Sequence, residues 1–127
     1  MILVDTSIWV DHLRDNDGAL QRLLHVGQVL GHPWVIGEIA LGQLRQRHEV
    51  IALLNGLPTA SVATTHEMLA LIDRRELMGR GIGYVDLQLL AATQLTADAT
   101  LWTRDKRLAA SAARLGLAAD VAIVSDE

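Results

Sequence analysis

The sequence predicts an α/β fold with a central, mainly parallel β-sheet. Short apolar runs alternate along the chain with stretches in which apolar residues recur at helical spacing. The first run, residues 2–4, is apolar throughout, as is typical of strands in parallel sheets that helices cover on both faces. We expect the 127 residues to form one domain, residues 1–127, which can bury about two-thirds of its unfolded surface.

The first half of the chain is expected to contain two strands and four helices. Thr6 and Ser7 follow the first strand and carry the hydroxyl groups that favour a helix start. Residues 15–18 break the first helix, and Pro33 marks a turn after the second strand. The expected elements are a strand over 2–4, helices over 7–13 and 18–26, a strand over 28–31, and helices over 35–45 and 47–54.

The second half continues the alternation of strands and helices. Thr64 and Glu67 have the spacing of a helix start, residues 79–83 form a glycine-rich loop, and Gly116 ends the last helix. The expected elements are a strand over 60–63, helices over 64–78 and 84–95, a strand over 100–103, a helix over 106–115 and a strand over 121–124.

Composition excludes several classes of protein. The chain has no cysteine, which excludes a disulfide framework and a thiolate metal site. The five histidines have no zinc-binding spacing, so we interpret them as surface or loop residues. No apolar window reaches the ~20 residues of a membrane span, and Asp5 interrupts the first apolar run, so we expect a cytoplasmic protein without a signal peptide. A net charge of −4 means that RNA binding would need a local basic patch and bound cations.

Four carboxylates stand at positions that a parallel sheet would bring together. Asp5 ends the first strand and Asp105 follows the strand over 100–103, and ligands bind beyond the carboxyl ends of such strands. Asp86 lies in the first turn of its helix on the face that we expect to pack inward, whereas Gln88 lies on another face. The fourth acid, at the margin of an apolar helical stripe, is Glu38.

Each acid also has an explanation that needs no function. Asp5, Asp86 and Asp105 suit helix caps or first turns, and Glu38 suits a solvated position paired with Arg45. Together, however, converging carboxylates repel one another unless a cation lies between them. Since cysteine and paired histidines are absent, the cluster favours Mg²⁺ or Mn²⁺ held through oxygen and water.

The same motifs, in order, resemble those of the PIN-domain nucleases, and among these the VapC toxins of bacterial toxin–antitoxin pairs are most similar, in length as well. The resemblance spans the whole chain, and its motifs are residues 2–7, Glu38 within a helix, residues 86–92 and residues 101–105. The chain departs from the family pattern at Leu87-Gln88 and in the glycines that flank Glu38, and neither departure involves an acid.

The resemblance implies an α/β/α sandwich that hydrolyses RNA phosphodiester bonds with Mg²⁺ or Mn²⁺. It also implies an RNA substrate, a cognate antitoxin protein and a homodimer. The family's acidic positions fall on Asp5, Glu38, Asp86 and Asp105, and its hydroxyl-bearing positions fall on Thr6 and Thr103.

The chemistry of phosphodiester hydrolysis suggests a role for each acid. Asp5 and Asp86 are expected to be the principal metal ligands, with Asp105 completing the site directly or through water. Glu38 would orient or deprotonate the attacking water, or reach a second ion. Thr6 and Thr103 would hold a carboxylate in place.

Two groups of basic residues are candidates for contacts with RNA phosphates. Arg104, Lys106 and Arg107 flank Asp105, and the second group consists of Arg74, Arg75 and Arg80. A solvated helix face explains either group equally well on charge pattern alone.

Two other functions remain open at this stage. A receiver-type signalling domain also places acids at strand ends around Mg²⁺, but the chain lacks an Asp at the end of the strand expected over 60–63. The other alternative is a PIN-like binding module that has lost catalysis.

Overall fold

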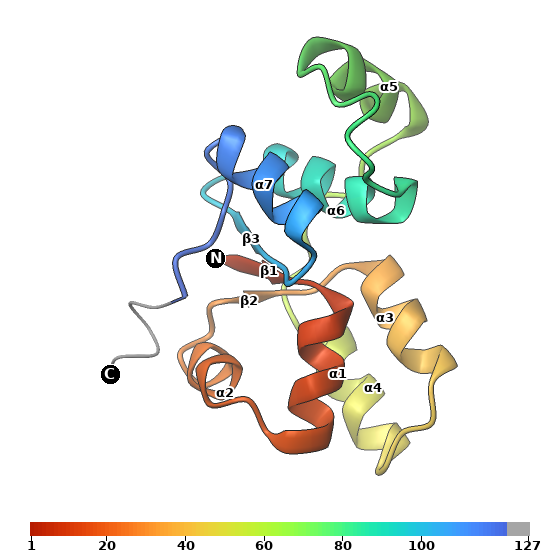
Figure 1. The fold of residues 1–127 in the computed structure, drawn as a ribbon. Coiled ribbons are helices and arrows are strands. Elements are labelled where there is room, and N and C mark those ends of the chain that lie inside the picture. The colour runs from red at the N-terminus through yellow and green to blue at the C-terminus, as the bar shows by residue number, and fades with distance from the viewer. Residues whose placement is uncertain (122–127) are drawn as a thin grey trace.

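A parallel sheet lies at the centre of the molecule with helices on both of its faces (Figure 1). The computed structural model describes residues 1–121. Within these residues the sheet has three strands in the order β2-β1-β3, with both neighbouring pairs parallel. The strands are β1 (Ile2–Val4), β2 (Val29–Leu30) and β3 (Thr100–Trp102). Ile2 pairs with both Val29 and Thr100, so β1 is the central strand, and the predicted α/β fold with a parallel sheet is confirmed.

Seven helices cover the sheet in the described part of the chain. Helices lie on both sides of the sheet, which gives the α/β/α arrangement (Figure 1). On one side are α1 (Thr6–Asp15), α2 (Gly18–His25), α3 (Pro33–Leu41) and α4 (Arg47–Asn55). On the other side are α5 (Thr65–Arg74), α6 (Tyr84–Leu95) and α7 (Lys106–Arg114). None of the helices in residues 1–121 is long and apolar enough to cross a bilayer.

The prediction of a strand over 60–63 is wrong, because the structure has no strand there. Its place is taken by a single parallel bridge between Gly31 and Thr59, with the Ala60 amide donating to the Gly31 carbonyl at 2.9 Å. A longer ladder cannot form because β2 passes into α3 within three residues, which leaves no partner backbone for residues 60–63.

The strand predicted over 121–124 lies outside the described residues except for Val121, which is not in a strand. The chain pairs with the sheet slightly earlier. Leu101 of β3 forms a parallel bridge with Ala118, and its amide donates to the Leu117 carbonyl at 2.7 Å.

Two helices, α3 and α5, differ most from their predicted bounds. The helix α3 starts at Pro33, which is the first helical residue rather than a turn, because the missing N–H of proline is not needed there. It ends at Leu41 instead of residue 45, since Gly42 is extended. The helix α5 ends at Arg74 instead of residue 78, and Glu76 just beyond it has a positive φ of 54°.

The helix α6 is buried on every side. It packs against α5, α7 and β3, and every residue from Leu87 to Thr93 is buried. Gln88, predicted to lie on a different face from Asp86, is buried as well, with 3% of its surface exposed. A helix packed between three other elements has no solvent-exposed face along most of its length. A helical wheel that assumes one buried and one exposed face does not predict this.

His32 is buried in the core with no exposed surface, which corrects its interpretation as a surface or loop residue. Its Nδ1 accepts a hydrogen bond from the Trp34 amide at 3.1 Å and caps α3. The residue joins β2 to α3, and so short a connection from a central sheet to its covering helix holds the ring inside.

Burial lowers the pKa of the His32 imidazole below its ordinary value. The unfolded chain therefore binds a proton near pH 6.5 that the folded protein does not, and the free energy of unfolding falls as the pH drops below about 6.5. In His32→Asn, the side-chain amide oxygen can still accept the capping hydrogen bond of α3, but the side chain has no group that binds a proton in this pH range. We expect the variant to have a lower Tm at pH 7.5 and a smaller loss of Tm between pH 7.5 and 5.5, measured by calorimetry. Equal losses in variant and parent would contradict this.

Candidate metal centre

Asp5 is held by three elements at once. It follows β1 and caps α1, with Oδ1 accepting from the Thr6 amide at 2.7 Å. Its Oδ2 accepts from the Thr103 hydroxyl at 2.7 Å, and its own amide donates to the Trp102 carbonyl at 3.0 Å. Asp5 is 7% exposed, so its carboxylate is buried in a fixed orientation. Capping and a site role are therefore compatible in this residue.

Asp105 is tied to Asp5 through the same hydroxyl group. The Asp105 amide donates to Thr103 Oγ1 at 3.1 Å, while that hydroxyl donates to Asp5. Asp105 also caps α7, since its Oδ1 accepts from the amides of Arg107 and Leu108 at 3.0 Å each. Thr103 thus joins two of the four predicted acids.

Glu38 reaches the site from the second turn of α3. It is exposed, and its Oε1 accepts from the Thr6 hydroxyl at 2.8 Å. The alternative pairing with Arg45 does not occur, because α3 ends before Arg45 and no ion pair within residues 1–121 joins the two. Thr6 therefore contacts two acids: Asp5 through its amide and Glu38 through its hydroxyl.

Asp86 differs from Asp5 and Asp105 because capping does not explain it. It lies in the first turn of α6, whose N-cap is Gly83, and no hydrogen bond or ion pair within the described residues involves its carboxylate. Its pKa is raised, first by burial and then by the negative charges of Asp5, Asp105 and Glu38. An acid placed among three others without a partner calls for a cation.

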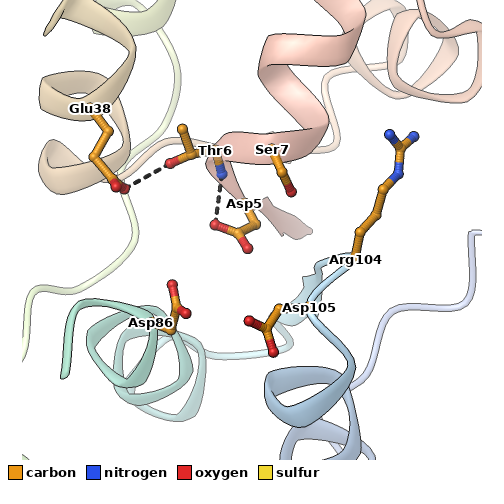
Figure 2. Close-up of a pocket in the computed structure, with 7 residues that line it drawn as sticks. All are labelled: Asp5, Thr6, Ser7, Glu38, Asp86, Arg104 and Asp105. Atoms are coloured by element: carbon orange, nitrogen blue, oxygen red, sulfur yellow. Dashed lines mark hydrogen bonds between the residues drawn. The ribbon is translucent and has the colours of Figure 1, made fainter. Parts of the chain in front are cut away.

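The four acids line one open pocket of about 470 Å³. Their carboxylates point toward a common space, although they come from separate parts of the chain (Figure 2). The other lining residues are Thr6, Ser7 and Arg104. Ser7 was expected to cap the helix, but Asp5 caps α1 and Ser7 lies at the pocket wall. Ser7 comes two residues after Asp5, the acid that ends the first strand, and this position is the sequence signal that could have placed it at the pocket.

The donor set of the pocket fits a hydrated hard cation. Within residues 1–121, no group of three or more His, Cys, Asp or Glu side chains is arranged so that it could hold a metal ion directly. Mg²⁺ characteristically binds through one or two carboxylates and keeps several waters, so an open, all-oxygen pocket with an unpaired Asp86 suits it.

The basic residues near Asp105 do not behave alike. Arg104 lines the pocket but its guanidinium extends away from the acids (Figure 2) and pairs with Asp11 and Asp17. Lys106 and Arg107 are exposed in the first turn of α7.

The second basic group does not join the pocket. Arg74 and Arg75 line a separate cavity of about 310 Å³ between α5 and α6. The Arg80 Nε donates to the Glu76 carbonyl at 2.8 Å.

Comparison with known proteins identifies the family. The PIN domain model matches residues 2–114. Two relatives, both named Ribonuclease VapC32 and from the CDC 1551 / Oshkosh and ATCC 25618 / H37Rv strains of Mycobacterium tuberculosis, are each 50% identical over 118 residues. The alignment covers 93% of this chain and 95% of each relative. The chain belongs to the VapC-type PIN-domain family. The family resemblance of the motifs is thereby confirmed, and the receiver-domain alternative is excluded for this VapC-type PIN domain.

The raised pKa of Asp86 makes its ionised form unfavourable to folding. The folded protein binds this proton more tightly than the unfolded chain, so stability is lost as the pH rises from about 4 through the folded-state pKa. In EDTA at pH 7, Asp86→Asn is expected to raise the Tm, and the difference should vanish near pH 3. The exposed Asp73→Asn is the control. A Tm of Asp86→Asn equal to or below that of the parent at pH 7 would refute this assignment.

The Thr103 hydroxyl is expected to contribute to stability through its bond to the Asp5 carboxylate. Thr103→Val leaves a buried charged acceptor without its donor, which should lower the free energy of unfolding by about 1.5–3 kcal/mol. Urea unfolding measures the change. Thr100→Val, in the strand that leads to Thr103, serves as the control and should lose less than Thr103→Val.

Proposed function

We propose that this protein is a divalent-metal-dependent endoribonuclease that acts as the toxin of a VapBC-type toxin–antitoxin pair. Membership of the VapC-type PIN family and the ribonuclease names of its relatives support an RNA-cleaving activity. The observation that carries the proposal is the convergence of four carboxylates in one open pocket, with Asp86 unpaired among them.

Asp5 and Asp86 are the principal ligands of Mg²⁺ or Mn²⁺ in this proposal, and Asp105 completes the site directly or through water. A bound divalent ion would lower the pKa of a water ligand and neutralise charge on the phosphoryl oxygens. Asp5 supports the role because Thr6 and Thr103 fix both of its oxygens, which leaves little freedom to reorganise on binding.

Glu38 orients or deprotonates the attacking water in this proposal. It is exposed at the pocket wall, and the Thr6 hydroxyl holds one of its oxygens while the other remains able to accept a proton. A carboxylate held in this way can orient or deprotonate a water molecule in the pocket.

Lys106 and Arg107 bind RNA phosphates in this proposal. Both are exposed in the turn that begins at Asp105, so they flank the acids. The role fits Arg104 less well because two carboxylates already neutralise it.

A cognate antitoxin, a homodimer and a cytoplasmic location complete the proposal. The antitoxin follows from the VapC names of the relatives, and the other two remain predictions from the sequence.

Cleavage of RNA tests the proposal. Purified protein should cleave RNA with Mg²⁺ or Mn²⁺ and stop in EDTA, and Asp5→Asn or Asp86→Asn should each reduce the rate by about 100-fold or more. Asp73→Asn, an acid of the same type outside the pocket, should cleave like the parent. RNA binding without metal-dependent cleavage would contradict the proposal and favour the catalytically silent module.

The phosphate contacts predict a specific salt dependence. Each phosphate neutralised on single-stranded RNA contributes a slope of about −0.7 to the plot of log binding constant against log salt concentration. Lys106→Ala and Arg107→Ala should each make that slope less steep by about 0.7, measured by fluorescence anisotropy. An unchanged slope in both variants would remove them from the RNA site.

A further inference from the structure

Arg104 presents a problem for the metal site. It follows Thr103, precedes Asp105 and lines the acid pocket, so it brings a positive charge to the site whose carboxylates should bind a cation. Arginine pairs strongly with carboxylates through its fork of donors. Nevertheless, the side chain extends away from the acids (Figure 2).

Two acids outside the pocket hold the guanidinium in that direction. Its Nη1 pairs with Oδ2 of Asp11 in α1, and its Nη2 pairs with Oδ2 of Asp17 at 3.1 Å. One donor group thus goes to each acid, which fixes the plane of the guanidinium. The pocket acids receive no bond from it within the described residues.

Asp17 is a firm anchor for this arrangement. Its Oδ1 caps α2 by accepting from the amides of Ala19 and Leu20 at 3.0 and 3.1 Å, so only Oδ2 is left for Arg104. Its side chain is 21% exposed, against 45% for Arg104, so this ion pair is partly shielded from water.

We propose that Asp11 and Asp17 are positioning residues that hold Arg104 out of the acid pocket and so keep Asp5, Asp86 and Asp105 available to a divalent cation. The inference rests on the proposed metal site. Without the two anchors, the guanidinium would be free to turn toward the carboxylates of the pocket that Arg104 lines, and it would compete with the metal ion for them.

An ordinary structural role makes a different prediction. Exposed ion pairs contribute about 0–1 kcal/mol to stability and have no effect on a neighbouring metal site beyond their charge. The decisive quantity is therefore the affinity for Mn²⁺ and its dependence on Arg104.

Calorimetric titration of the metal-free protein with MnCl₂ in 0.15 M salt tests the proposal. The Asp11→Asn/Asp17→Asn variant keeps side-chain size and an amide oxygen to cap α2. Its dissociation constant for Mn²⁺ should rise by about fivefold or more. Adding Arg104→Gln to the same variant should return the constant to within about twofold of the parent's value, because the competing cation is gone.

The matched control is Asp15→Asn/Asp73→Asn, which also removes two negative charges but from exposed positions outside the pocket. It should leave the dissociation constant nearly unchanged, since neither residue lines the pocket or forms an ion pair with Arg104 in the described part of the chain.

The outcomes separate this inference from the proposed function. Parent-like Mn²⁺ affinity in the Asp11→Asn/Asp17→Asn variant would overturn the inference and leave the metal site standing. Weakened binding that Arg104→Gln does not restore would also overturn it. If the parent itself binds Mn²⁺ no better than Asp5→Asn, the proposed metal site fails and the inference fails with it.

Discussion

The Asp5 carboxylate is the interaction on which the rest of the site depends. It lies where β1 ends, α1 begins and β3 passes alongside, and each of its oxygens accepts a hydrogen bond from a different element. The partner just beyond β3 is Thr103, whose hydroxyl also accepts from the Asp105 amide. Because these contacts are short and mutually linked, moving one acid would disturb its neighbours as well as the start of α1.

The remaining acids add charge to this fixed centre at a cost to stability. Asp86 caps nothing, and burial and three neighbouring carboxylates raise its pKa. Such an arrangement opposes folding unless a cation relieves it, and groups of this kind are typical of functional sites. Arg104 is the basic residue that lines the pocket, and its pairing with Asp11 and Asp17 leaves that repulsion in place.

The convergence of the acids could be predicted because it follows from topology. Parallel strands bring their carboxyl ends to one edge, so Asp5 and Asp105 had to lie close together once β1 and β3 were recognised as strands. The long apolar run of α6 likewise allowed Asp86 to be placed in the first turn of a helix that packs inward. Contacts between residues far apart in sequence could not be predicted, since no local pattern encodes them.

The features that the sequence did not predict all depend on tertiary packing. The bond from Thr6 to Glu38 and the pairing of Arg104 with Asp11 depend on how α1, α3 and β3 pack. Burial of Gln88 depends on helices packed on several sides of α6, and the missing strand over 60–63 depends on the shortness of β2. Each is decided by tertiary packing, which overrides the local pattern.

The position of a bound metal ion tests the central claim most directly. Anomalous diffraction from crystals of the protein grown with MnCl₂ locates manganese without reference to activity. The account predicts an anomalous peak between the carboxylates of Asp5 and Asp86, which is absent in crystals of Asp5→Asn. A manganese ion bound only elsewhere, or no ion in the pocket at saturating MnCl₂, would contradict it.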